Sequence, residues 1–172
     1  MINALVNTPT SWNVVEPPPG VALVAIEPAA VDADGKRTFR PNVVVTMVDR
    51  PAGDDVDAYI EDVIAHLLVD LDGAELIDVF TIRQPIDLTA DPADAASSAA
   101  GAGDAVPSAA RPNFGQRLIV QHRLGEINLE TVQQHSWVDD TVVIVTVTVP
   151  VGRADELAPT LSNCLDSVAV AA

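Results

Sequence analysis

The stretch from Val142 to Val149 (Val-Val-Ile-Val-Thr-Val-Thr-Val) constrains the fold more than any other feature of the sequence. One face of this stretch is apolar and the other carries Val, Ile and Thr, which is typical of a strand in the middle of a sheet. Left exposed, such a strand would be prone to aggregate. We therefore expect other strands on both sides of it.

The residues before it supply two such strands. Arg117–Arg123 and Ile127–His135 are both strand-like, and the connection at 124–126 contains a glycine. The segment 136–140 has the composition of a turn and leads into a strand over 141–149. Short connections of this kind join antiparallel neighbours. The sequence therefore predicts an antiparallel meander.

Four further strands are predicted nearer the N-terminus. Trp12–Val15 and Val21–Ile26 are two short β-rich runs around the rigid corner Pro17–Gly20. Residues 41–48 are apolar on both faces, which predicts an interior strand covered on two sides. The pattern returns to a strand at Glu75–Ile82.

A helix is predicted over residues 54–72, where Asp54 or Asp55 can cap its start and Gly73 can end it. Apolar residues recur at helical spacing, so that one face is expected to be core and to cover a sheet. These residues are Val56, Tyr59, Ile60, Val63, Ile64, Leu67, Leu68 and Leu71.

A second helix is predicted over residues 154–169, with one face formed by Leu157, Leu161, Cys164, Leu165 and Val168. Pro159 makes its start uncertain, because proline is tolerated only in the first turn of a helix. The two helices and the strands predict an α+β fold, in which helices flank one antiparallel sheet of five or more strands.

The length of 172 residues suits a single domain over 1–172. Residues 89–112 consist almost entirely of small, polar and proline residues. Such a segment buries too little apolar surface to offset the entropy of ordering it. We therefore expect a mobile, low-complexity loop that interrupts the domain.

The composition excludes several function classes. A formal net charge of −16 argues against nucleic acid and anionic membrane as partners, because both require a basic surface. The sequence contains no apolar run long enough for a membrane span, and no signal peptide or lipobox is visible, so a cytoplasmic location is expected. Eight Arg against one Lys, with abundant Ala and Val, favour a GC-rich, actinobacterial source; a halophile is the alternative.

Two acidic motifs could in principle hold a metal. Asp62, His66 and Asp70 are one turn apart on the outer face of the first helix, but a solvated face explains them without a metal. Asp32-x-Asp34-Gly35 and Asp70-x-Asp72-Gly73 resemble the start of a calcium loop. Both lack the glutamate at position twelve, so we interpret them as turns. The sequence predicts no metal site and no cofactor.

Ser136, His135 and the aspartates at 139 and 140 lie within a few residues, and His122 is on a neighbouring predicted strand. A catalytic triad needs a nucleophile on a strained turn, such as G-x-S-x-G, and that motif is absent. Cys164 lies on an apolar helix face and is interpreted as a buried thiol. No catalytic residue is therefore assigned.

The order of elements resembles the fold of PsbP, the extrinsic protein of photosystem II, and more closely the actinobacterial LpqN-type lipoprotein family. The resemblance rests on Trp12 with the Pro-rich corner, the strand F-x-P-N-V-V-V-T at Phe39–Thr46 and the late Val/Thr strand. It covers roughly residues 10 to 170. It implies a sheet with helices against it, used mainly as a non-catalytic binding module.

We therefore expect a non-enzymatic protein-binding or adaptor module, with chaperones of secreted proteins among its DcrB-like relatives. The charge predicts a basic or amphipathic protein partner, and a homodimer is also considered. The alternative is a small enzyme or a small-ligand-binding protein with a pocket between sheet and helix, lined by His122 or His135.

Overall fold

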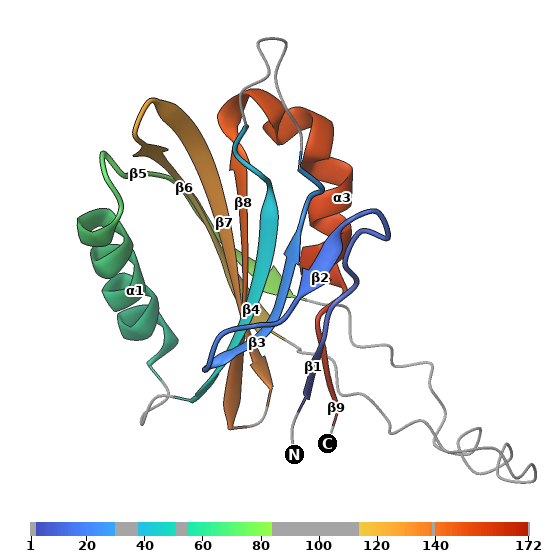
Figure 1. The fold of residues 1–172 in the computed structure, drawn as a ribbon. Coiled ribbons are helices and arrows are strands. Elements are labelled where there is room, and N and C mark those ends of the chain that lie inside the picture. The colour runs from blue at the N-terminus through green and yellow to red at the C-terminus, as the bar shows by residue number, and fades with distance from the viewer. Residues whose placement is uncertain (1–2, 30–37, 51–54, 84–113, 139, 172) are drawn as a thin grey trace, which may run out of the picture.

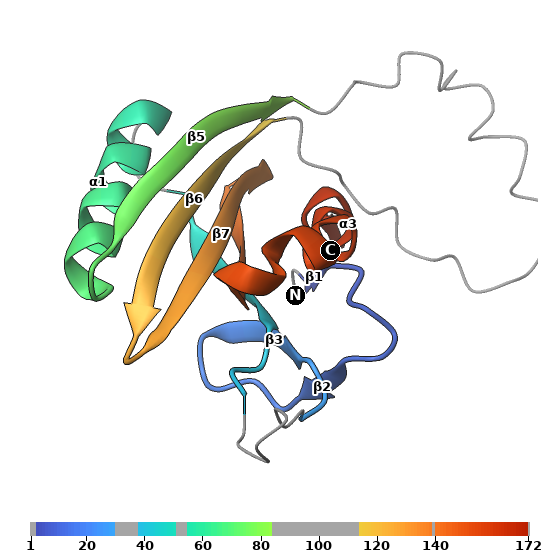
Figure 2. The same ribbon diagram turned by 90° about the horizontal axis from the view of Figure 1, so that it is seen from above.

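A computed structural model describes residues 3–29, 38–50, 55–83, 114–138 and 140–171. Seven strands form one antiparallel sheet in the order β2-β3-β4-β8-β7-β6-β5, and β1 pairs with β9 in a separate two-stranded sheet. Helices α1 and α3 lie on opposite faces of the large sheet (Figures 1 and 2). This confirms the predicted α+β fold. The elements are β1 (Asn3–Leu5), β2 (Asn13–Val15), β3 (Val21–Ile26), β4 (Asn42–Asp49), α1 (Val56–Asp70), β5 (Glu75–Arg83), β6 (Phe114–Leu124), β7 (Ile127–Val138), β8 (Thr141–Pro150), the 3-10 helix η1 (Val151–Arg153), α3 (Ala154–Asp166) and β9 (Ala169–Ala171).

Strand β8 is the fourth of the seven strands, as its sequence predicted. It pairs with β4 on one side and with β7 on the other. The meander β6-β7-β8 is also confirmed, and Gly125 takes a φ of +63° in the two-residue turn that joins β6 to β7. That left-handed backbone explains the glycine.

Strand β7 is longer than predicted. Ser136, Trp137 and Val138 continue the strand and pair with β8, where a turn was expected over 136–140. Their partners Gly115 on β6 and Val142 and Val143 on β8 are buried, and pairing with them extends the ladder. The intrinsic strand propensity of a residue predicts its conformation poorly where pairing with neighbouring strands determines it.

Helix α3 packs on the main hydrophobic core. Its buried residues Leu157, Leu161, Cys164 and Leu165 lie in one cluster with the α3-facing valines of β4 and β8, and with Trp12. The helix ends at Asp166, three residues earlier than predicted, because the chain turns to pair β9 with β1. Pro159 lies inside the helix, where the sequence argument allowed it only in the first turn. It is on the exposed side, so water can bind the backbone carbonyl that proline leaves unpaired.

Helix α1 is shorter than predicted and less buried. The Asp55 side chain accepts a hydrogen bond from the Ala58 amide at 2.9 Å, which settles the choice of cap. The helix ends at Asp70, and Gly73 follows in the turn with a φ of +61°. Ile60 is the one buried residue of α1, and Leu68 is 40% exposed. The prediction that the whole apolar face of this helix is core was therefore wrong.

The sheet face beside α1 is only partly covered. Leu118 and Val120 of β6 and Leu129 of β7 are buried there. On the same face, the side chains that β8, β4 and β3 contribute are mostly half-buried, and Val48 is exposed. The strand predicted over 41–48 is interior, as expected, but only its α3-facing side is fully covered. The prediction of cover on both sides was wrong.

An ion-pair network fastens α3 to the strands. The Arg153 guanidinium donates to both carboxylate oxygens of Glu27 at 2.6 and 3.0 Å and also contacts Glu156. Glu27 follows β3, and Arg153 immediately precedes α3. Bidentate pairing of this kind fixes geometry as well as charge.

No helix in the described residues is long and apolar enough to cross a membrane. The predicted loop at 89–112 falls outside the described residues.

Candidate functional site

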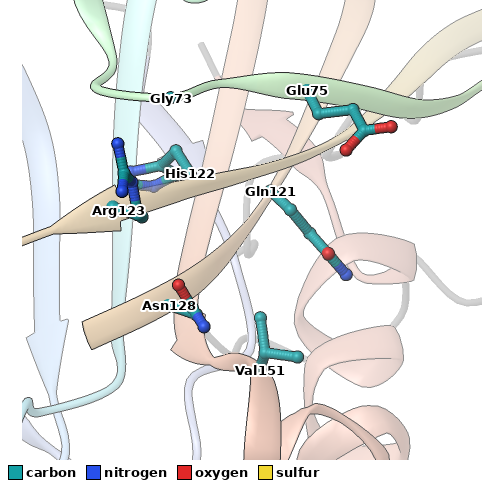
Figure 3. A pocket seen from close by; sticks show the side chains of 7 residues that line it. All are labelled: Gly73, Glu75, Gln121, His122, Arg123, Asn128 and Val151. Atoms are coloured by element: carbon teal, nitrogen blue, oxygen red, sulfur yellow. The ribbon is translucent and has the colours of Figure 1, made fainter. Parts of the chain in front are cut away.

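A pocket lined by polar groups lies where three connections of the described chain meet. The α1–β5 turn, the β6–β7 hairpin and the start of η1 surround a volume of about 260 Å³ (Figure 3). Seven residues line it: Gly73, Glu75, Gln121, His122, Arg123, Asn128 and Val151. The pocket is thus at one end of the sheet, not between the sheet and a helix as the sequence argument had placed it.

One wall of the pocket is built by Arg123. Its amide donates to the Asp72 carbonyl at 2.8 Å, and its guanidinium lies 3.6 Å from the Asp72 carboxylate. The φ of +61° at Gly73 favours glycine, and a Cβ atom there would approach the Arg123 Nε to 2.9 Å, so that this side chain would have to shift. The aspartate and glycine of the second calcium-like motif therefore serve a turn that holds an arginine.

His122 borders the pocket and is tied to the sheet. Its Nε2 lies 2.9 Å from the Thr131 hydroxyl, and this hydroxyl lies 3.1 Å from the Thr148 hydroxyl. The chain of contacts joins β6, β7 and β8. Gln121, on the adjacent position, donates to the Glu130 carboxylate at 3.2 Å. The side chains lining this pocket could hydrogen-bond a small polar ligand.

His135 lies elsewhere, under α1. The Tyr59 hydroxyl is 3.1 Å from its Nδ1, and its Nε2 is 3.2 Å from the Gln133 amide oxygen. Tyr59 also packs edge-on against Trp137, with ring centroids 5.9 Å apart. Burial lowers the pKa of His135 to about 4, and burial raises the pKa of Tyr59. His135 is therefore neutral near pH 7 and holds α1 to the sheet.

The structure does not bring the two histidines together. Gln116 is the β6 partner of His135, and it lies six residues from His122 along the strand. At about 3.3 Å per residue the two histidines are roughly 20 Å apart. Ser136 follows His135 in the same strand, so the two side chains point to opposite faces of the sheet. The Ser136–His135 pair cannot converge as a nucleophile and its base.

Ser136 belongs instead to a buried polar network on the α3 side. The Gln134 amide nitrogen donates to the Leu165 carbonyl at 2.7 Å and to the Ser136 hydroxyl at 3.3 Å. Arg117 donates to the Gln134 amide oxygen at 3.1 Å and to Asp166 at 2.8 Å. The network joins β6, β7 and the end of α3. Sequence reasoning missed it, because its members come from three separate elements.

The acidic stripe on α1 is solvated. The His66 Nδ1 contacts the Asp62 carbonyl at 2.8 Å and the Asp62 carboxylate at 3.5 Å, and both side chains are well exposed. The hydrogen bond to this carbonyl, and then the charges of Asp62 and Asp70, raise the pKa of His66. Within the described ranges, no group of three His, Cys, Asp or Glu side chains is placed to hold a metal ion.

Two further sequence candidates have simple outcomes. Cys164 is buried on the apolar side of α3, as predicted, and burial raises the pKa of its thiol. The first calcium-like motif, at 32–35, and the aspartate at 139 lie outside the described residues. The pocket residues Gln121, Arg123 and Asn128 were not singled out from the sequence. The sequence contained a signal for them, because these polar residues lie close to the two-residue turn of the predicted β6–β7 hairpin and are therefore near one another at its end.

No protein-family model and no curated protein matches the sequence. Solved structures do match. LpqN of Mycobacterium tuberculosis, described as involved in cell envelope biogenesis, matches with a TM-score of 0.60 and 11% identity, over 100% of this chain and 85% of LpqN. Cyanobacterial PsbP from Synechocystis matches with a TM-score of 0.56 and 12% identity, over 97% and 91% of the two chains. The Saccharomyces cerevisiae Ran-binding protein Mog1p matches with a TM-score of 0.55 and 12% identity, over 96% and 88%. The chain therefore has a PsbP-like fold.

Proposed function

We propose that this protein acts by binding a protein partner, as an adaptor or chaperone, and not by catalysing a reaction. The observation that carries the proposal is the half-covered face of the sheet. Val24 of β3 pairs there with Val44 of β4, and Ile144 of β8 lies two residues farther along, opposite Thr46, with no helix of the described chain over these strands. Apolar surface left accessible on a folded domain is a common mark of an interaction site.

Three further observations support the proposal. The fold of this chain is similar to that of Mog1p, which is named as a Ran-binding protein. His135 is committed to Tyr59 and Gln133, and Ser136 to the network on the opposite face, so neither is free to act on a substrate. The net charge of −16 favours a basic or amphipathic partner and association rates that fall with salt.

The experiment is a capture assay followed by a substitution series. The tagged chain is used to purify stoichiometric partners from a native lysate, and the complex is reconstituted from purified components. His122→Gln should leave the affinity within twofold of the wild type. Loss of a measurable reaction on a small substrate in His122→Gln alone would overturn the proposal.

The second candidate function is binding of a small polar ligand, and the pocket at the hairpin end favours it. His122, Arg123 and Asn128 line its volume of about 260 Å³. Small-ligand sites usually combine a few convergent polar groups with an apolar lining, which this pocket has only at Val151. A ligand that raises the melting temperature of the wild type but not of Arg123→Ala would support this candidate.

A further inference from the structure

We propose that the partner contributes one basic amphipathic helix, which packs beside α1 on strands β8, β4 and β3. This inference rests on the proposed function and specifies the surface and the chemistry of the partner. It follows from an asymmetry of the sheet: one face is covered along its central strands, and the other is covered only over β5, β6 and β7.

The floor of the surface is uncharged. The side chains that β3, β4 and β8 direct to this face are aliphatic residues and threonines, with one asparagine at the end. Most of these side chains are half-buried. This exposure is expected for side chains that contact their neighbours within the sheet but are not covered by a second layer. The side chains of this face are Val21, Val24, Ile26, Asn42, Val44, Thr46, Val48, Ile144, Thr146 and Thr148, together with Val142, which is fully buried beneath its neighbours. We call this surface the open half-face.

The open half-face has the dimensions of one helix. Three strands about 4.8 Å apart span roughly 10 Å between the outer two, which matches the 10–12 Å diameter of an α-helix. The eight residues of β4 extend about 27 Å, the length of roughly 18 helical residues. A helix lying there would be the neighbour of α1 in the same layer.

The wall beside the open half-face is acidic. Tyr59 contacts His135 and Trp137 of β7, so its side of α1 is turned toward β8. Asp62, His66 and Asp70 follow Tyr59 at intervals of three, four and four residues, which keeps them on the same side of the helix. An approaching helix would meet carboxylates there, so its flank should carry Lys or Arg.

A second copy of this chain is a poor occupant of the open half-face. Two copies in contact would bring two acidic stripes together, on molecules that each carry a net charge of −16. Like charges brought together at an interface oppose association. A basic helix from another protein removes this repulsion and adds attraction.

The probe for the test is a fluorescein-labelled peptide of 18 residues, with Leu at i, i+3, i+4 and i+7 spacing and Lys at the other positions. A scrambled peptide of the same composition, in which the leucines share no face, is the control. Fluorescence anisotropy at two salt concentrations gives the affinities. The ordered peptide should bind at least tenfold more tightly than the scrambled one.

Matched variants locate the binding. Val44→Lys places a positive charge in the floor, and Val69→Lys makes the same change at an 83% exposed valine on the outer side of α1. The first should weaken binding at least tenfold and the second less than twofold. Thr146→Arg, at a half-buried threonine of the same face, provides a second floor variant if Val44→Lys does not fold.

The acidic wall is tested in the same way. Asp62→Asn with Asp70→Asn should weaken binding three- to fivefold. Asp57→Asn with Glu61→Gln, on the other side of α1, removes the same charge and should change it less than twofold. Equal effects of the two pairs, or of Val44→Lys and Val69→Lys, would mean nonspecific attraction and would overturn the inference.

Two other outcomes would also overturn it. Absence of peptide binding to the wild type would do so, as would a wild-type dimer by light scattering that Val44→Lys converts to a monomer. The failure of this inference can be told apart from failure of the proposed function. A captured protein partner that binds the wild type and Val44→Lys equally would leave the proposed function standing and assign it to another surface.

Discussion

Strand β4 presents two apolar faces that the molecule treats differently. Val43 and Val45 point toward α3 and are at most 1% exposed, whereas Val44 between them is half-buried on the other face. The same alternation runs through β8, where Val143, Val145 and Val147 are fully buried and the residues between them are not. The pattern of apolar residues therefore shows which side chains of a strand can be buried. Whether they are buried depends on whether a helix packs over that face of the sheet.

The two helices show the same contrast. Helix α3 buries four residues and is joined to the sheet by the Arg153–Glu27 pair and by the Arg117–Gln134–Asp166 network. Helix α1 buries Ile60 and reaches the sheet through Tyr59. We infer that the α3 face contributes most of the stability of the fold, and that the α1 face is the adaptable one.

The largest expected effect tests the α3 face. Leu161→Ala should lower the free energy of unfolding by about 2–5 kcal/mol, because it removes a buried side chain and leaves a cavity in the main core. Urea denaturation followed by circular dichroism measures this. A loss below 1 kcal/mol would contradict the assignment of the core to this face.

The next effect concerns pH and the α1 face. Burial lowers the pKa of His135 to about 4 in the folded chain, whereas an unfolded chain has a pKa near 6.5. The unfolded state therefore binds the proton first. The contribution of His135 to the free energy of unfolding is fully present above pH 6.5. It is lost as the pH falls toward 4, at about 1.4 kcal/mol per pH unit and roughly 3 kcal/mol in all.

The measurement is the free energy of unfolding between pH 7.5 and 4 for the wild type and for His135→Gln. The variant should lose this part of the pH dependence. His66 provides the control, because its pKa is raised and its contribution has the opposite sign. An unchanged pH profile in His135→Gln would show that this residue is not the titrating group.

A smaller effect is expected from the helix that covers only part of its face. Leu67 of α1 is half-buried. Leu67→Ala should therefore cost about 1–2 kcal/mol, since it removes less apolar contact than a core truncation. Leu161→Ala and Leu67→Ala are measured under the same conditions. The difference between their losses in free energy of unfolding quantifies the contrast between the two faces. Equal losses would remove the contrast.

Much of this architecture is readable from the sequence, for a physical reason. The Val/Thr run of β8 can only be stable between other strands, and the spacing of Leu157, Leu161 and Leu165 fixes the buried side of α3. What the sequence could not supply is the pairing between distant elements. The open half-face exists because α1 lies over β5, β6 and β7, and no local pattern determines that choice.

The candidate site was harder to predict than the fold. His135 and Ser136 were considered as members of a triad because they are adjacent in the sequence, and no catalytic role was assigned to them; the segment 136–140 was interpreted as a turn. Once Ser136 is inside a strand, alternation alone sends the two side chains to opposite faces. The network of Arg117, Gln134 and Asp166 joins β6, β7 and α3, so it becomes visible only when these elements are placed together.

The smallest effect expected is also the most direct test of the comparison, because it uses one substitution on the two faces of one strand. Val44→Thr should change the free energy of unfolding by less than about 0.5 kcal/mol, since the new hydroxyl on the open half-face remains accessible to water. Val45→Thr puts the same hydroxyl into the α3 core, where it lacks water, and should cost about 1–3 kcal/mol. Both variants keep the β-branched shape, so the strand itself is unaffected. Urea denaturation of the two proteins gives the difference. A cost above 1 kcal/mol for Val44→Thr would mean that this face is covered in solution, and the docking surface proposed there would no longer be available.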